Sequence, residues 1–357
     1  ESPEQADWPW IAPGFFDLQV NGYGGTWYAD TNLTVEKFAE TLPPYLEHGV
    51  TRIFPTLITA SHESLLKGFR VIGEAYRQSA DVRRLVAGCH LEGPYLSSED
   101  GPRGAHPREH CRPADWEEFQ KLQEASGGLI RLVTLAPEVE GAIDFIKRAV
   151  REKIVISIGH TAATLEQIQA AVDAGAQLST HLGNGAHPVM KRHPNYIWDQ
   201  LGEPRLKASL IADGFHLSPS VLRSMVWAKG VKSIVLTCDA SGLAGCPPGI
   251  YDNEAGGYEV LPEGKIVVAG QRQLLAGSAL FTDSCVATVV RSGAANLREA
   301  VRMVTEQPLS LFQLPQGDLR PGDRSDIVLF HFDGQESNLR IVATISAGTI
   351  RHGAVPR

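Results

Sequence analysis

The chain has 357 residues, of which 43% are hydrophobic and 21% are charged, and its formal net charge is -8. The length suits one large domain with an appendage, and the composition is ordinary for a soluble globular protein. The negative charge and the lack of a dense Lys/Arg block argue against nucleic-acid binding. No apolar run approaches the ~18 residues of a membrane helix, and no basic-then-apolar signal pattern opens the chain.

The cysteines are an odd number without CxxC spacing, which indicates a reducing compartment rather than a disulfide framework or a structural zinc cluster. They are Cys89, Cys111, Cys238, Cys246 and Cys285. Because the sequence also shows no membrane or secretion signal, we expect a cytoplasmic protein without a membrane partner.

Short apolar runs alternate with amphipathic helical stretches from about residue 10 onward. The runs that we predict to be strands are 10–22, 49–56, 83–93, 128–137, 153–160, 178–185, 206–216 and 232–240. The stretches that we predict to be helices are 33–49, 62–79, 114–126, 141–153, 164–175 and 218–230. Buried strands joined by helical crossovers are parallel. Eight of them predict an α/β fold that closes into a (β/α)8 TIM barrel.

The sequence changes character after the eighth predicted strand. Residues 242–275 are rich in Gly and Pro and predict a β-hairpin excursion near 245–275. Two helices are expected next, at 281–293 and 296–312, and the remaining residues read as β-strands joined by Gly/Asp turns. We therefore predict a barrel at 11–310 and a small accessory β-domain formed by 1–10 and 311–357.

Four of the predicted strands end in a polar side chain that is able to bind a metal or to move a proton. These residues are Glu92, His160, His181 and Asp239. The carboxyl ends of barrel strands meet on one face, so we expect the four side chains to converge. A single strand-end histidine is more often a hydrogen-bonded structural residue, but four buried polar groups together are costly without a shared partner.

A divalent cation would satisfy Glu92, His160 and His181 together and leave one coordination position open, as in hydrolytic metal sites. Asp239 would stay ionised beside the cation and act as the proton carrier. The alternative for Asp239 is a carboxylate that caps the following turn. The mixed nitrogen and oxygen donors favour Zn²⁺, while Fe²⁺, Mn²⁺ and Co²⁺ also suit them.

The segments FFDLQVNGYGG, HLEGPYL, VTLAPE, GHTAAT, THLGNGA, IADGFH, TCDA and AGSAL occur in this order over nearly the whole chain. Together they resemble the N-acetylglucosamine-6-phosphate deacetylase family of the amidohydrolase superfamily. The resemblance implies a metal-dependent amidohydrolase barrel that removes the N-acetyl group of an amino-sugar phosphate. It implies that Glu92, His160 and His181 bind the metal and that Asp239 is the general acid/base.

The resemblance also concerns the first strand. Gln19 and Asn21 stand where amidohydrolase barrels often carry a His-x-His pair that binds a second metal. Neutral amides bind metal weakly but are able to hold a coordinated water. We therefore expect one divalent metal ion per subunit, with Gln19 and Asn21 beside it.

Further residues are implied as substrate contacts by the same resemblance. They are His106, Asn184, the backbone of Gly185, Arg192 and His216. Arg192 corresponds to an arginine that binds the sugar phosphate, often from a neighbouring subunit, so the resemblance implies a homodimer. From the residues alone, Lys191 and Arg192 are equally compatible with a solvated loop.

Some segments depart from the family pattern. THLGNGAHP has a glycine where the family carries a bulky aromatic residue, and the loop at 97–113 is longer. The family's usual N-terminal β-strands do not precede the first barrel strand, so we expect either an incomplete stretch or a reduced β-domain. Two other functions stay open: a related amidohydrolase acting on another N-acyl amino-sugar or an N-acyl amino acid, and a non-catalytic binding barrel.

Overall fold

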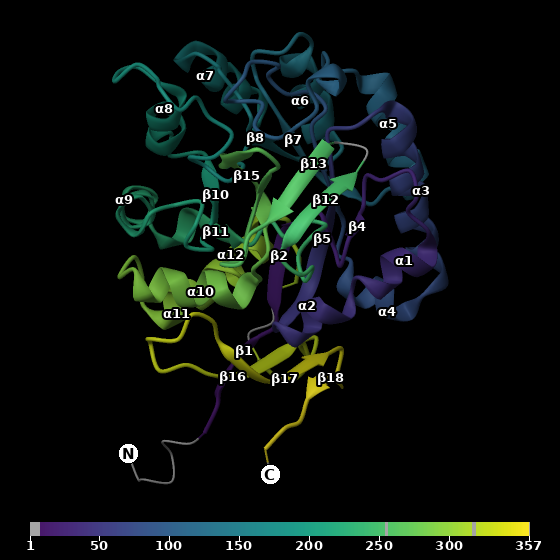
Figure 1. The fold of residues 1–357 in the computed structure, drawn as a ribbon, viewed down its shortest axis with the longest axis vertical. Coiled ribbons are helices and arrows are strands. Elements are labelled where there is room, and N and C mark those ends of the chain that lie inside the picture. Colours follow the sequence, from purple (N-terminus) through teal and green to yellow (C-terminus); the bar gives the residue numbers. More distant parts are fainter. Residues whose placement is uncertain (1–7, 254–255, 316–318, 357) are drawn as a thin grey trace.

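The computed structural model describes residues 8–253, 256–315 and 319–356. Within these ranges, eight parallel strands form one sheet in the order β11-β10-β9-β8-β7-β6-β5-β2. A parallel bridge between Val20 and Ala240 joins its two edges, which closes the sheet into the predicted barrel (Figure 1). The strands are β2 (Phe15–Val20), β5 (Val50–Ile58), β6 (Cys89–Glu92), β7 (Ile130–Leu135), β8 (Val155–Ile158), β9 (Leu178–Ser179), β10 (Lys207–Ile211) and β11 (Ile234–Thr237).

Helices surround the barrel in Figure 1. They are α1 (Val35–Glu40), α2 (Pro43–Glu47), α3 (His62–Gln78), α4 (Ala80–Leu85), α5 (Trp116–Ser126), α6 (Ala142–Arg151), α7 (Leu165–Ala174), α8 (Tyr196–Gly202), α9 (Pro219–Lys229), α10 (Thr282–Arg291), α11 (Leu297–Met303) and α12 (Glu306–Leu311). Two of the helices predicted from the sequence each form two shorter helices in the structure. The stretch 33–49 forms α1 and α2, and 296–312 forms α11 and α12. Proline is tolerated only in the first turn of a helix, so Pro43 and Pro308 each require a new helix to begin just before them.

The barrel interior changes from apolar to polar along its axis. At one end, Phe16, Phe54 and Leu178 pack with Leu309 and Phe312 of the α12 region, which closes that end of the barrel. Toward the carboxyl ends of the strands, the buried side chains are hydroxyls, amides and imidazoles. The polar half of the barrel is therefore where a site can form.

A small antiparallel sheet lies below the barrel in Figure 1, next to both chain ends. Its strands are β1 (Trp10–Pro13), β16 (Ile327–His331), β17 (Arg340–Ser346) and β18 (Thr349–Gly353). The predicted first strand is thus divided at Gly14, where an added Cβ would lie 2.2 Å from Oγ1 of Thr51. The predicted boundary at residue 11 falls inside β1, and residues 1–7 of the predicted β-domain lie outside the described residues.

The predicted hairpin excursion is a larger unit. Its described residues form an antiparallel sheet of β12 (Gly249–Asn253), β13 (Gly256–Val260), β14 (Lys265–Val268) and β15 (Gln271–Ser278). A second bridge, between Ala240 and Ser278, attaches β15 beside the end of β11. Trp27, from the short pair β3 (Gly22–Tyr23) and β4 (Thr26–Trp27), packs against Tyr258 in a tilted arrangement at 5.3 Å between ring centroids. The sheet therefore lies over the carboxyl ends of the strands.

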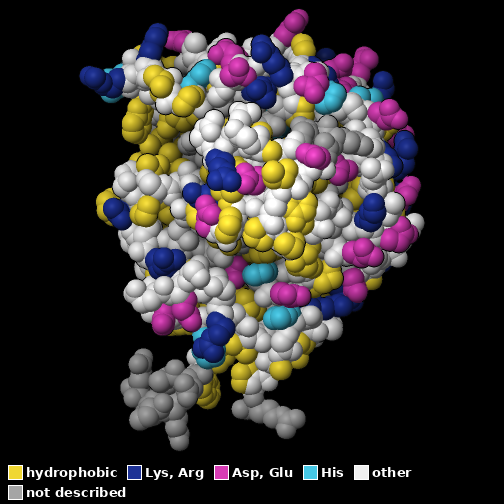
Figure 2. Space-filling model, viewed as in Figure 1, with side chains coloured by type: hydrophobic (Ala, Val, Ile, Leu, Met, Phe, Trp, Pro, Cys, Tyr) yellow, Lys and Arg dark blue, Asp and Glu magenta, His cyan; other side chains and the backbone are white. Residues whose placement is uncertain are grey.

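The surface view in Figure 2 shows Lys and Arg side chains interspersed with Asp and Glu over this face. No helix in the described ranges is long and apolar enough to span a membrane. The five cysteines are all free thiols.

Candidate active site

A cavity of about 390 Å³ opens at the carboxyl ends of the barrel strands. The predicted strand-end residues all line it, together with the loops at 101–106 and 183–186, the loop after β10, and β15 of the excursion sheet. The predicted convergence of Glu92, His160, His181 and Asp239 is therefore observed. Because β15 contributes Gln273 to Gly277, the excursion sheet forms part of the cavity wall.

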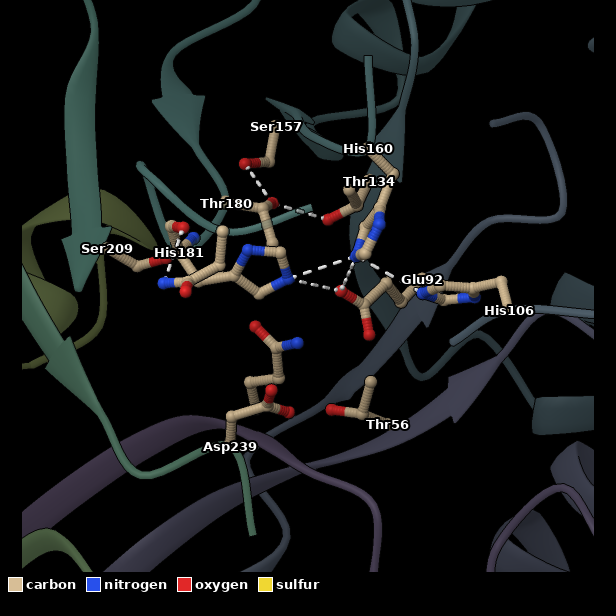
Figure 3. A network of polar contacts seen from close by, with 12 residues as sticks. Thr56, Glu92, His106, Thr134, Ser157, His160, Thr180, His181, Ser209 and Asp239 are labelled. Carbon is tan, nitrogen blue, oxygen red and sulfur yellow. Dashed lines mark hydrogen bonds and ion pairs between the residues drawn. The ribbon is translucent and has the colours of Figure 1, made fainter. Parts of the chain in front are cut away.

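The imidazoles and the Glu92 carboxylate point toward one another (Figure 3). Oε1 of Glu92 lies 3.0 Å from Nε2 of His181 and 3.3 Å from Nε2 of His160. The two Nε2 atoms of His160 and His181 are 3.1 Å apart, and Nε2 of His106 is also 3.1 Å from that of His160. Glu92, His106 and His160 form a group that is able to hold a metal ion. His106, predicted as a substrate contact, thus lies directly against the predicted ligands.

The protonation pattern of this cluster fits a cation. Nδ1 of His160 lies 2.9 Å from the carbonyl oxygen of Pro102, which only accepts, so Nδ1 carries a hydrogen. Nε2 of His160, which faces the cluster, is therefore the nitrogen that would offer its lone pair to a metal ion. Ligands about 2.0–2.1 Å from a tetrahedral cation are spaced by roughly 3.3 Å, which is close to the distances here. The donor set therefore fits a divalent metal.

The pKa values of these groups agree with metal binding, which requires deprotonated ligands. Burial raises the pKa of Glu92, but hydrogen bonds from His160 and His181 outweigh it and lower that pKa well below its usual range. Burial, and then the charge of His160, lower the pKa of His106 well below its usual value. The carboxylate is therefore ionised, and the imidazole of His106 is neutral.

The backbone is strained at three of the four strand ends. His160, His181 and Asp239 have φ angles of 50°, 29° and 51°, in the left-handed region that non-glycine residues rarely adopt. Such conformations cost about 1–3 kcal/mol each and persist where the surroundings enforce them. The amide of His181 is held by Oγ of Ser209 at 2.7 Å, and that of Asp239 by Oγ1 of Thr237 at 3.2 Å. This clustering of strain supports a functional site.

Asp239 faces the cluster from the eighth strand. Burial, followed by repulsion from Glu92, raises the pKa of Asp239 to about 8, although His181 and a hydrogen bond from Asn21 oppose the rise. A cation held by Glu92 would lower this pKa again, because opposite charge favours the carboxylate. The protonation of Asp239 is thus coupled to the charge that the neighbouring cluster holds.

Asp17 fixes the position of Asp239 and is a residue that the sequence analysis missed. Its buried carboxylate accepts from Oγ1 of Thr237 at 2.5 Å, from the amide of Cys238 at 2.8 Å and from Oγ1 of Thr282 at 2.7 Å. These bonds tie β2 to the end of β11 and to α10. A charged residue inside the apolar run FFDLQV was the available signal, because a buried carboxylate needs partners.

The first-strand amides have different surroundings. Asn21 donates to Asp239 and to the carbonyl of Ala240. Both amide atoms of Gln19 are buried and have no hydrogen-bond partner among the described residues. Buried polar atoms without a protein partner usually bind water or an ion, so Gln19 supports the prediction that this strand holds a water beside the metal.

A belt of hydroxyls supports the cluster from inside the barrel, and the sequence analysis missed it as well. Oγ1 of Thr180 lies 2.7 Å from Oγ1 of Thr134 and 2.5 Å from Oγ of Ser157 (Figure 3). Nε2 of His90 lies 2.8 Å from Oγ1 of Thr134. Burial lowers the pKa of His90 to about 4, so this ring is neutral. Together with His90, the belt joins four adjacent strands next to the two histidines that are predicted to bind the metal.

The structure places some of the predicted substrate contacts in the cavity and leaves one outside it. Asn184, Gly185 and His216 line the cavity, whereas Arg192 is exposed and lies outside the lining. Nδ1 of His216 lies 2.7 Å from Oδ2 of Asp213, which was also missed and which orients the ring. The lining contains no Lys or Arg among the described residues, so this chain alone brings no permanent cation into the cavity.

Comparison with known proteins agrees with this barrel and metal-type site. The chain belongs to the amidohydrolase family, which it matches over residues 10–351. The family consists of hydrolases of carbon–nitrogen bonds, as predicted. Within it, the chain is similar to proteins named for the deacetylation of amino-sugar phosphates.

Three relatives define this similarity. The N-acetylglucosamine-6-phosphate deacetylase of Bacillus subtilis (strain 168) is 31% identical over 95% of this chain and 84% of its own length. The N-acetylgalactosamine-6-phosphate deacetylase of a Shewanella strain is also 31% identical, over 96% of this chain and 85% of its own. A variant N-acetyl-D-glucosamine-6-phosphate deacetylase from Mycobacterium smegmatis, solved with N-acetyl-D-glucosamine-6-phosphate, has a TM-score of 0.85. Its sequence is 30% identical to this one, and the match covers 96% of this chain and 86% of the Mycobacterium smegmatis chain.

Proposed function

We propose that this protein hydrolyses the N-acetyl group of N-acetylglucosamine 6-phosphate to give glucosamine 6-phosphate and acetate. The observation that carries the proposal is the buried Asp239 carboxylate facing the cluster of Glu92, His160 and His181 inside one cavity. The relatives support the choice of substrate.

Glu92, His160 and His181 would hold one divalent ion, for which Zn²⁺ suits the donors best. Such an ion polarises a carbonyl and lowers the pKa of water. Asp239 takes the proton of the attacking water and later delivers it to the amine as the C–N bond breaks. Asn21 fixes the carboxylate during both transfers.

Substrate binding is assigned to the outer part of the cavity. Asn184 and the backbone of Gly185 line one wall, and His216 presents its ring from the opposite loop. His106, at the end of the loop at 101–106, has its Nε2 3.1 Å from Nε2 of His160, close enough to contact the acyl group or to join the metal ligands. Arg192 would reach the phosphate only from a second subunit, so its use requires a homodimer.

N-acetylgalactosamine 6-phosphate is the second candidate substrate. The Shewanella relative named for that sugar is as similar to this chain as the Bacillus subtilis relative named for the glucosamine derivative. The two sugars differ at one hydroxyl, and the cavity wall at 183–186 carries small residues that do not by themselves select between them.

Acetate release should be measured at steady state with both 6-phosphates, with N-acetylglucosamine and with N-acyl amino acids. We expect kcat/KM to be highest for a 6-phosphate. Equal activity on N-acetylglucosamine would reject the phosphate requirement, and a preference for N-acyl amino acids would reject the sugar. A protein that stays inactive on every compound after addition of Zn²⁺ would instead be a non-catalytic barrel.

A further inference from the structure

The proposed substrate carries a phosphate dianion, but the described cavity lining has no Lys or Arg. A cation just behind the lining would resolve this mismatch without a second subunit. Lys265, at the start of β14 in the excursion sheet, occupies such a position. Its Nζ lies 5.3 Å from the centroid of the Phe215 ring, and Phe215 and its neighbour His216 both line the cavity.

The backbone of Lys265 is anchored beside the reacting centre. Lys265 pairs with Ser278 in the β14–β15 ladder. The amide of Ser278 donates to the carbonyl oxygen of Asp239 at 2.9 Å. The flexible side chain therefore starts from a fixed point next to the eighth strand and extends toward the loop that follows β10.

Lys265 also differs from the neighbouring arginines, whose charges are already paired. Arg103 forms an ion pair with Asp100 at 2.7 Å, and Arg272 forms one with Glu259 at 2.6 Å. The ammonium of Lys265 has no ion pair or side-chain hydrogen bond to any residue in the described ranges; its contact is the Phe215 ring. A partly buried lysine held only by a cation–π contact is free to exchange that contact for an anion.

We infer that Lys265 is a specificity-determining residue that binds the phosphate of the substrate in cis, opposite His216. The inference rests on the proposed function. Upon binding, the ammonium leaves the face of Phe215 and donates to a phosphate oxygen, because a charge-assisted hydrogen bond is stronger than the cation–π contact. Asp213, which orients His216, keeps the imidazole aimed at the same anion. The excursion sheet thus supplies the residue that distinguishes a phosphorylated substrate from an unphosphorylated one.

The test compares Lys265→Gln, Lys265→Arg and the wild type on N-acetylglucosamine and its 6-phosphate. We expect Lys265→Gln to lower kcat/KM for the 6-phosphate about tenfold or more, mainly through KM, and to leave the unphosphorylated sugar unaffected. Lys265→Arg should restore most of the loss. Competitive inhibition by inorganic phosphate should weaken in parallel, as the removal of one phosphate contact predicts.

Arg272→Gln is the matched control, because it removes one positive charge from the same sheet at a paired, exposed position. It should change neither substrate preference nor phosphate inhibition. If the wild type prefers the 6-phosphate and Lys265→Gln keeps that preference in full, the inference is overturned while the proposed function stands. If the wild type shows no preference for the phosphate, both fail. Equal losses on both sugars would show a structural role and also overturn the inference.

Discussion

Nδ2 of Asn21 donates a hydrogen bond to Oδ1 of Asp239 across 2.7 Å, which joins the first and last barrel strands at the proposed proton carrier. The same nitrogen lies 3.1 Å from the carbonyl of Ala240. The carboxylate, which lines the cavity, is therefore held in one orientation. Orientation of a general base matters because proton transfer requires hydrogen-bond distance to the water.

Replacing Asn21 by Ala should lower kcat about 10–100-fold, since a hydrogen bond to a charged group contributes roughly 1.5–3 kcal/mol.

Asp239→Asn should lower kcat about 10²–10⁴-fold, the usual contribution of a general acid/base. Metal content should stay near that of the wild type in both variants. Retained turnover in Asp239→Asn would remove Asp239 from the mechanism.

Metal dependence gives a second prediction. Dialysis against a chelator should abolish activity, and added Zn²⁺ should restore it. His181→Ala should reduce bound metal at least about tenfold, measured by elemental analysis after dialysis, because two protein donors hold a divalent ion less tightly than three. His62→Ala is the control: His62 is a partly exposed histidine bonded to Glu118 on α5. Equal metal loss in both variants would contradict the ligand assignment.

The third prediction concerns Gly185, which lies against the ring of His160. A Cβ there would lie 2.6 Å from Nδ1 of His160, and its φ is +57°. Gly185→Ala should displace the His160 ring from Pro102 and lower both metal content and kcat by at least about tenfold. Gly128→Ala has a comparable φ of +83° but no atom within 4 Å of the added Cβ. It should lower stability by about 1 kcal/mol and leave metal binding unchanged.

A fourth prediction concerns stability at alkaline pH. Nζ of Lys229 donates to the carbonyls of Glu203 and Leu206. Burial lowers the pKa of Lys229 to about 8, against about 10.4 in an unfolded chain. Between these values the unfolded state binds more protons, so the free energy of unfolding should rise with pH. Below about pH 8 both states are protonated and this slope is absent.

Lys229→Arg is the comparison for this test, because a guanidinium stays protonated throughout the range. Urea unfolding at pH 7.5, 8.5 and 9.5 should show the wild type gaining stability relative to the variant as the pH rises. Parallel curves for the two proteins would show that Lys229 does not titrate between pH 7.5 and 9.5.

The barrel was predictable because each of its strands can be recognised from its own local sequence. Val and Ile runs bounded by glycines, with amphipathic stretches between them, indicate parallel strands wherever they occur. The divided helices were harder to predict, since Pro43 and Pro308 lie inside otherwise regular helical patterns. The excursion sheet was underestimated because β15 reads QRQLLAGS, whose exposed polar half gives no clean alternation. Its pairing with β14 depends on bulges that spacing alone does not reveal.

The convergence of the site was predictable for a related reason: strand ends in a barrel share one face. What the sequence did not reveal was how these groups are held. Asp17 is 220 residues from Thr237 and 265 residues from Thr282 in the sequence, and only the closed barrel brings them together. Arg192 is the opposite case, since its charge suited a phosphate contact but its loop leads away from the cavity of its own chain.

The sheet at 249–278 is inserted between the last barrel strand and α10, and it contacts the barrel through the backbone at Ala240 and Ser278 and through Tyr258 packed on Trp27. Its sequence can therefore vary, or be exchanged with that of a relative, without disturbing the strands that carry Glu92, His160 and His181. The proposed phosphate contact of Lys265 is thus encoded apart from the proposed metal ligands, whereas Asn184 and His216 belong to loops of the barrel itself. Such a division allows one hydrolytic centre to be adapted to new sugars by changing an inserted segment.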